Sequence, residues 1–228
     1  MMSSYTTQIQ HHGFALCPAV LDAETITQLS KKLHIEGALH GIRDVFNKYP
    51  IVRQLAESKP ILQLVRSILG DSAFPVKALY FNKTLGHNWN VAWHQDLNIT
   101  VKQQIYMNGF HKWSIKQGIY HVQPPVSLLE NMLTLRIHLD DASKDNGALR
   151  VISGSHKHGK IGKQDLSQKI KQDDVVICEA QAGDVLLMRP LLLHASHKNL
   201  SLNQRRVIHI EFAAQALPEP LQWYETIK

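Results

Sequence analysis

After Gly70 the chain becomes a series of short aliphatic and β-branched runs separated by turn signals. Short strands that do not alternate with long helices disfavour a parallel α/β fold. They fit two antiparallel sheets packed face to face, with helices outside. We therefore predict a mainly β protein with flanking helices and a jelly-roll core at about 75–213. The runs are Ala78–Phe81, Met132–Leu139, Leu149–Ile152, Val175–Cys178, Val185–Met188 and Arg206–Phe212.

Helical patterns precede these strands. Residues 22–39 carry an apolar stripe behind Asp22, which can cap a helix. A second helical block covers about 50–69, with prolines at first-turn positions. The sequence shows no internal repeat and no linker. We predict one domain over 1–228, whose helical part occupies about 20–70.

Composition limits the class of protein. No apolar run reaches the roughly 20 residues of a membrane helix, and the first residues do not read as a signal peptide. The two cysteines, Cys17 and Cys178, lie in apolar surroundings and are expected to be reduced and buried. We expect a cytoplasmic protein.

The net charge of +6 permits an anionic partner. Several lysines between 157 and 171 contribute to it, in a stretch that we interpret first as a solvated loop or short helix face. An anion-binding rim for a phosphate or acyl-CoA substrate is the less favoured alternative. No nucleic-acid motif is present.

The stretch Trp93-His94-Gln95-Asp96 carries the first sign of chemistry. In extended backbone, side chains two apart point to the same face. His94 and Asp96 would therefore project together, while Gln95 turns away. One imidazole and one carboxylate are two of the three ligands of the facial triad that binds non-heme Fe(II).

A third ligand can come from the stretch between Gly183 and His197. A Gly-Asp turn there begins a predicted strand, which would deliver His194 near its end. Arg205 follows eleven residues after His194. A guanidinium is the best partner for a carboxylate held in a fixed orientation, so Arg205 could anchor a dicarboxylate whose other end chelates the metal.

This order of motifs, His-x-Asp, a long gap, then His with Arg eleven later, resembles the 2-oxoglutarate-dependent Fe(II) dioxygenases. More narrowly, the chain resembles the phytanoyl-CoA dioxygenase family. The resemblance runs from about 75 to 213 and rests on Phe81–Lys83, Trp93–Asp96, Asn146–His156 and Gly183–Arg205.

The resemblance implies a double-stranded β-helix, cupin-like core, with Fe(II) bound by His94, Asp96 and His194 and 2-oxoglutarate held by Arg205. It also implies a reaction with O₂ that hydroxylates a C–H bond of a small organic molecule and releases succinate and CO₂. The family is broad, so phytanoyl-CoA is not inferred as the substrate. The positive charge is consistent with an anionic substrate.

Neighbouring residues leave alternatives open. His197 is expected at the surface, and Arg206 is expected to face solvent or pair with an acid, because adjacent strand residues face opposite sides. Lys83 is a candidate for contact with a co-substrate carboxylate, or else an exposed strand lysine. Arg136 and His138 share one strand face, exposed or in a cleft, and Arg136 is the better candidate to touch co-substrate or substrate.

Trp93 is expected in the core, and His209 is expected to be a hydrogen-bonded histidine. Segment 97–125 is long, polar and poorly periodic, as active-site lids often are. The alternative is a loop packed for stability. If the segment is a lid, the candidates for substrate contact are Asn98, Tyr106, Trp113 and His121.

Two other classes of function remain. One is a jelly-roll binding module with a structural metal such as Zn²⁺ and no oxygenase activity. The other is a 2-oxoglutarate oxygenase acting on a macromolecule, suggested by the positive charge alone. Halogenation is disfavoured, because Asp96 occupies the position where such enzymes usually leave room for chloride. Oligomeric state does not follow from the sequence.

Overall fold

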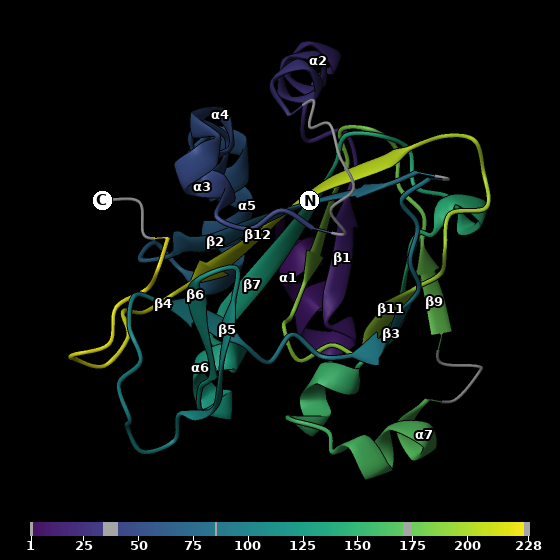
Figure 1. Cartoon of the computed structure of the whole chain (residues 1–228). Coiled ribbons are helices and arrows are strands. Elements are labelled where there is room, and N and C mark those ends of the chain that lie inside the picture. Colours follow the sequence, from purple (N-terminus) through teal and green to yellow (C-terminus); the bar gives the residue numbers. More distant parts are fainter. Residues whose placement is uncertain (1, 34–40, 85, 171–174, 226–228) are drawn as a thin grey trace.

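The computed structural model describes residues 2–33, 41–84, 86–170 and 175–225. Its strands form three antiparallel sheets (Figure 1). The large sheet has the order β1 (Phe14–Cys17), β10 (Val185–Met188), β7 (Met132–His138), β12 (Arg205–Ala213), β2 (Phe74–Lys83). The second has the order β3 (Val91–His94), β11 (His194–Ser196), β8 (Leu149–Ile152), β9 (Val175–Cys178). The third has the order β4 (Ile99–Val101), β6 (Ile119–Gln123), β5 (His111–Lys116).

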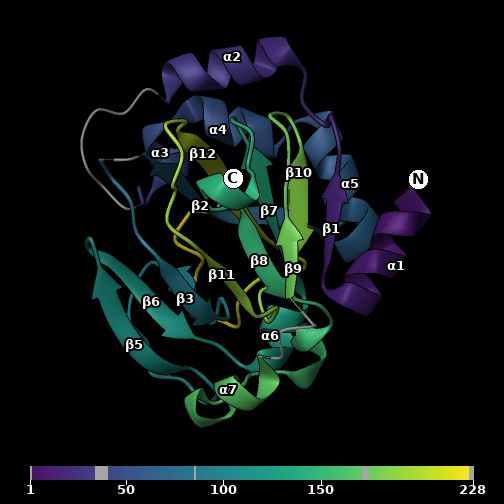
Figure 2. The ribbon, with the colours of Figure 1, turned by 90° about the vertical axis from the view of Figure 1, so that its right-hand side faces the viewer.

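The large and the second sheet face each other, and Figure 2 views the second sheet with the large sheet behind it. Leu186 and Met188 of β10 pack against Leu149 and Val151 of β8 between them. Two antiparallel sheets joined by an apolar layer form the predicted jelly roll. The predicted fold class, a double-stranded β-helix with flanking helices, is confirmed.

Helices cover the outer face of the large sheet and share one apolar core with it. They are α1 (Met2–His12), α2 (Ala23–Lys32), α3 (Val45–Lys48), α4 (Pro50–Ala56) and α5 (Lys59–Leu69). The shorter α6 (Val126–Glu130), η1 (Lys144–Asn146), η2 (Ser155–His158), η3 (Lys163–Asp165) and α7 (Leu166–Lys169) lie in connections between strands. Within the described residues, no helix is both long and apolar enough to cross a membrane.

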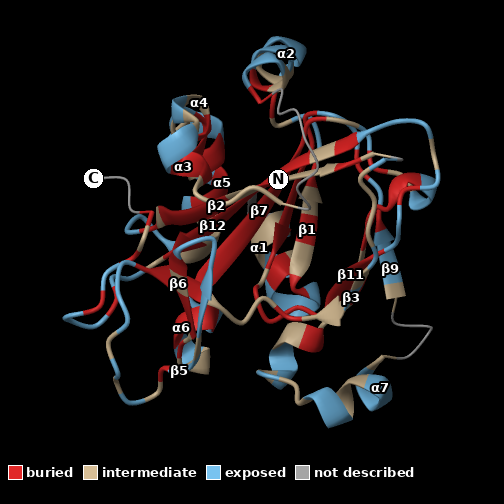
Figure 3. Ribbon diagram, viewed as in Figure 1, coloured by how far each residue is buried: buried red, intermediate tan, exposed pale blue. Residues whose placement is uncertain are grey.

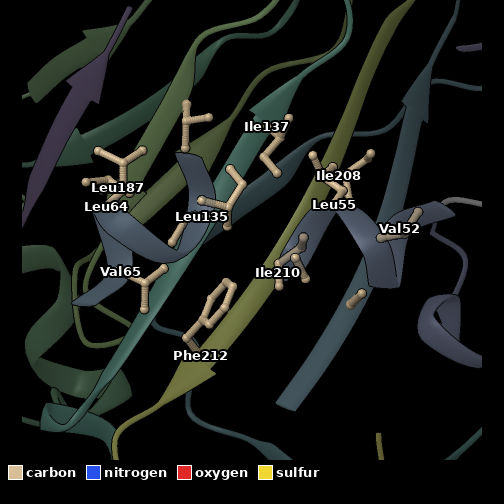
Figure 4. Close-up of a cluster of buried hydrophobic side chains, with 14 of the residues drawn as sticks. Val52, Leu55, Leu64, Val65, Leu135, Ile137, Leu187, Ile208, Ile210 and Phe212 are labelled. Atoms are coloured by element: carbon tan, nitrogen blue, oxygen red, sulfur yellow. The ribbon is translucent and has the colours of Figure 1, made fainter. Parts of the chain in front are cut away.

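Strand alternation separates the two faces of the large sheet. In β12, Ile208 and Ile210 point to the helices, as Figure 4 shows, and belong to the core they share. Arg205, His209 and Glu211 are also buried, on the opposite face of the same strand. That inner face of β12 is therefore polar, and it lies toward the second sheet.

Figure 3 shows buried strands at the centre and exposed connections around them. The lysines of the basic stretch that the structure describes (Lys157, Lys160, Lys163 and Lys169) are exposed, as expected of a solvated face; Lys171 lies outside the described residues. Cys17 and Cys178 are free and buried, which confirms their expected state.

The predicted helices are partly right. Asp22 caps α2 and accepts a hydrogen bond from the Thr25 amide at 2.8 Å, but the helix stops at Lys32; residues 34–39 of the predicted helix lie outside the described part. The block at 50–69 is two helices, α4 and α5, because the chain turns between them. All six predicted strand runs are strands. Neither α1 nor β1 was predicted.

Candidate metal centre and co-substrate pocket

Two strands of the second sheet bring the three candidate ligands together. His94 ends β3 and pairs in register with His194, the first residue of β11. The Nε2 atoms of His94 and His194 lie 3.8 and 3.7 Å from the two carboxylate oxygens of Asp96. One nitrogen or oxygen from each residue lies within 4.8 Å of the others. The sequence reasoning was wrong on one detail: β10 ends at Met188, and a turn intervenes before His194.

Backbone carbonyls fix the tautomer of both histidines. The Nδ1 atom of His94 lies 2.9 Å from the Ala92 oxygen, and that of His194 lies 2.9 Å from the Leu192 oxygen. A carbonyl oxygen only accepts hydrogen bonds, so each Nδ1 must carry the hydrogen. Each Nε2 then has a free lone pair aimed at the centre of the cluster, which is the state a metal ligand requires.

The electrostatics of the cluster also suit a cation. Burial by itself raises the pKa of Asp96, but His194, His209 and His94 nearby hold it below its ordinary value. The buried Asp96 Oδ2 has no hydrogen-bond partner among the described residues. Burial lowers the pKa of His194 to about 4, so this imidazole is neutral at neutral pH. Two imidazoles whose Nε2 atoms face the cluster and an unpartnered carboxylate oxygen fit a divalent metal such as Fe(II).

Gln95 faces away from the cavity, as predicted, and it also holds this segment in place. Its Nε2 donates to the Gly159 and Leu191 carbonyls, each at 2.7 Å, and its Oε1 accepts from the Ile161 amide at 2.9 Å. The buried amide thus ties the metal-site segment to the connection after β8 and to the turn before His194.

Replacing Gln95 with leucine should lower the free energy of unfolding by roughly 2–5 kcal/mol, because it leaves one buried and two partly buried backbone groups without partners. Urea unfolding followed by circular dichroism measures this. Gln28→Leu on the exposed face of α2 is the matched control, with an effect within about 0.5 kcal/mol. Equal unfolding free energies for both variants would contradict the anchoring role.

A cavity of about 730 Å³ adjoins the three ligands. Three cations line it from the inner face of the large sheet: Lys83, Arg136 and Arg205. These residues are only 1, 6 and 2% exposed, respectively. Arg205 of β12 stands opposite Lys83 of β2 in register. His94, at 41% side-chain exposure, is the ligand most open to this space, whereas His194 is 5% exposed.

The buried cations have unused donors. Lys83 Nζ donates to Ser196 Oγ at 2.9 Å and to the His197 carbonyl at 2.6 Å. In the part of the chain that the structure describes, buried Nε and Nη1 of Arg205 and Nε of Arg136 have no partner. Unpaired buried donors on cations are costly, and a carboxylate satisfies them best.

The cations also lower one another's pKa. Burial, then Arg205 and Arg136, lower the pKa of Lys83 to about 7. Burial and Arg136 lower the pKa of Arg205 to about 9. A bound dianion would raise both pKa values again, so the pocket suits a ligand with carboxylates.

Four other residues singled out in the sequence lie around the cavity or turn away from it. Arg206 turns away from the cavity and forms a two-pronged pair with Asp140, at 2.6 and 2.8 Å, and His197 is exposed, as expected. His138 is buried beside the site without lining the cavity. The core position predicted for Trp93 is wrong: its side chain is half-buried and lines the cavity, and the Arg150 guanidinium lies 5.2 Å from its ring.

Segment 97–125 contains the third sheet, which was not predicted. The four candidates for substrate contact do not line the cavity, and His121 is buried in β6. Among residues 97–125, Gln117 alone lines it, from the tip of the β5–β6 hairpin. Gln117 and Gly118 both have positive φ, +52° and +79°, as the two central residues of a type I′ hairpin turn do.

Sequence reasoning also missed Ser196 and Arg43, which line the cavity. Ser196 could have been found, because it stands two residues after His194 and therefore shares its face. Arg43 could not, because a loop before α3 brings it to the site.

Comparison with known proteins agrees with this geometry. Residues 19–207 match the family model described as phytanoyl-CoA dioxygenase (PhyH). An iron/alpha-ketoglutarate-dependent dioxygenase of Aspergillus calidoustus, ausU, is 26% identical over 208 residues, covering 88% of this chain and 67% of its own length. The ectoine dioxygenase of Sphingopyxis alaskensis is 21% identical over 206 residues, covering 81% of this chain and 59% of its own length. The chain thus spans about two-thirds or less of these curated relatives.

Solved structures show the same fold. The structure of EctD from S. alaskensis with 2-oxoglutarate and 5-hydroxyectoine superposes with a TM-score of 0.74 at 16% identity, over 99% of this chain and 83% of the other. Fold, ligand cluster and relatives together define the class as the iron- and 2-oxoglutarate-dependent dioxygenases. Within that class, the chain belongs to the phytanoyl-CoA dioxygenase family.

Proposed function

We propose that this protein is an Fe(II)- and 2-oxoglutarate-dependent dioxygenase that hydroxylates a C–H bond of a small organic molecule and releases succinate and CO₂. The observation that carries the proposal is the juxtaposition of the His94, Asp96 and His194 cluster with buried guanidinium donors that have no partner among the described residues. A structural metal site would have no use for those donors. They therefore favour an oxygenase over a metal-binding module.

In this proposal His94, Asp96 and His194 hold Fe(II), and Arg205 pairs with the distal carboxylate of 2-oxoglutarate. Bound Fe(II) supplies the activation of O₂ that couples decarboxylation of 2-oxoglutarate to C–H hydroxylation. Ser196 accepts a hydrogen bond from Lys83 and keeps its own hydrogen to donate toward the cavity. The apolar side chains of Leu79 and Leu149 line the same space and exclude water from it.

We further propose that the substrate carries an acidic group. Among the described residues that line the cavity, four are lysine or arginine and one, Asp96, is acidic. Fe(II) and the 2-oxoglutarate dianion cancel each other, so the positive excess remains for the substrate. Arg43 supplies it, since no hydrogen bond or ion pair joins its side chain to any described residue. Gln117 and the Trp93 ring line the same cavity.

A screen by succinate release tests both parts. Carboxylates, phosphates and matched neutral amides or alcohols are compared with enzyme, Fe(II) and 2-oxoglutarate. We expect acids to stimulate succinate release more than their neutral analogues. Arg43→Gln should raise KM for an acidic substrate at least about tenfold while leaving the slow substrate-free decarboxylation unchanged. A preference for neutral compounds would overturn the proposal that the substrate is acidic. If no succinate forms, either with any of the compounds or in their absence, the proposal that the protein is an oxygenase is overturned.

The affinity for 2-oxoglutarate should depend on pH through Lys83. Its ammonium form pairs with an anion, and its pKa is about 7 in the free protein. Binding above pH 7 therefore takes up a proton, and we expect Kd for 2-oxoglutarate to rise by up to about tenfold per pH unit between pH 7 and 9. Calorimetry across this range measures it. Lys83→Met should bind more weakly with a flatter profile, and equal profiles would contradict the role.

We also propose that residues 1–228 act as one domain, which the family match across both the helical part and the strands supports. A cytoplasmic location is proposed as well, supported by two cysteines that are both free and buried.

A further inference from the structure

A row of buried polar side chains runs behind the cavity on the inner face of the large sheet. Lys77 Nζ lies 2.6 Å from Glu211 Oε1, and the same oxygen lies 3.4 Å from His209 Nε2. His209 Nδ1 lies 3.3 Å from Arg136 Nη1. The four residues are 8, 4, 3 and 6% exposed, respectively. Arg136 and His209 line the cavity, whereas Lys77 and Glu211 do not.

The donors and acceptors of this row allow one arrangement. A guanidinium N–H can only donate, so His209 Nδ1 must accept from Arg136. The ring hydrogen of His209 is then on Nε2, which lies 3.4 Å from the Glu211 carboxylate without forming a hydrogen bond there. Lys77 keeps that carboxylate ionised: burial alone raises the pKa of Glu211, but Lys77 and His209 bring it below its ordinary value. The negative charge of Glu211 therefore favours the histidine tautomer that can accept a hydrogen bond from Arg136.

This contact orients Arg136. One nitrogen of its guanidinium is held by His209, and its centre lies 5.8 Å from the Phe81 ring. Its buried Nε has no partner among the described residues. A guanidinium fixed on one edge presents its remaining donors in one direction, which lowers the entropy lost when an anion binds.

We propose that His209 and Glu211 are positioning residues for Arg136, and that they set the affinity of the pocket for the carboxylate that Arg136 binds. The inference rests on the proposed function and adds to it that Arg136 binds a carboxylate of 2-oxoglutarate. Glu211, one of the two positioning residues, lies outside the cavity.

Calorimetric binding of 2-oxoglutarate to Mn(II)-loaded protein tests this without turnover. Glu211→Gln and His209→Leu should raise Kd for 2-oxoglutarate by roughly ten- to a hundredfold, which is the usual effect of losing a residue that orients a binding side chain. The affinity for Mn(II) should stay unchanged. His209→Asn keeps an acceptor near the Nδ1 position and should recover most of the affinity. The His209 variants keep the Lys77–Glu211 ion pair, so they stay informative if Glu211→Gln folds poorly.

Two controls separate the outcomes. Glu225→Gln makes the same change in a carboxylate that is equally buried but bonds the Phe46 and Ala78 amides away from the cavity, so it should not alter Kd. Arg205→Met tests the co-substrate site itself. If Glu211→Gln and His209→Leu bind 2-oxoglutarate with the wild-type Kd while Arg205→Met binds it weakly, the positioning inference is overturned and the co-substrate site stands. Equal losses in both His209 variants overturn the tautomer argument. Unchanged binding in Arg205→Met overturns the co-substrate site and the inference with it.

Discussion

Asp96→Ala should abolish 2-oxoglutarate turnover, with a loss of roughly a thousandfold or more, because two histidines alone hold Fe(II) weakly and without the charge of the carboxylate. The fold should survive. Asp96 Oδ2 accepts no hydrogen bond among the described residues, and the Asp96 side chain is 24% exposed, so its truncation leaves no buried hydrogen-bond donor without a partner. We therefore expect metal-free Asp96→Ala to unfold at the same urea concentration as metal-free wild type.

Divalent metal should distinguish the two proteins. Mn(II) should raise the melting temperature of the wild type and leave that of Asp96→Ala unchanged, because only the intact cluster binds the ion. Asp71→Ala, in an exposed turn, is the control and should behave like the wild type. Coupled succinate formation retained in Asp96→Ala would contradict the assignment of the metal site.

Arg205→Met should raise Kd for 2-oxoglutarate by roughly 30- to 1000-fold, the effect of removing one partner of a buried charge pair. In free protein the same change should cost little stability or increase it, because the guanidinium is buried with two nitrogens unpartnered among the described residues. Calorimetric titration and urea unfolding measure the two effects.

Arg206→Met is the matched control, since the two arginines are adjacent on β12 and face opposite ways. Arg206 loses its pair with Asp140 in this variant, so stability should fall while Kd stays unchanged. If both variants lost affinity equally, or if Arg206→Met alone did, Arg205 would not be the anchor.

The sequence was sufficient for features that depend on local spacing. His94 and Asp96 share a face because they are two apart, and Arg205 and Arg206 diverge because they are adjacent. The strand runs were found because their aliphatic and β-branched residues stand between turn signals. In contrast, α1 was missed because its sequence, MSSYTTQIQHH, is polar and contributes one residue, Ile9, to the buried core residues described.

Features that depend on pairing between distant strands could not be predicted. The contact of His209 with Arg136 exists because β12 and β7 pair with these residues opposite each other. Gln117 reaches the cavity because β5 and β6 form a hairpin within a segment whose polarity suggests a loop. Trp93 lines the cavity from β3, and the pairing of β3 with β11, about 100 residues further along the chain, is not visible in the sequence.

The most direct test of the central claim is an anaerobic optical titration of metal-free protein, first with Fe(II) and then with 2-oxoglutarate. We predict a visible charge-transfer band that appears only when both are present, that is absent in Asp96→Ala, and that requires far more 2-oxoglutarate in Arg205→Met. No band in folded wild-type protein with iron bound would contradict the account, because the site would then hold a metal without binding the co-substrate to it.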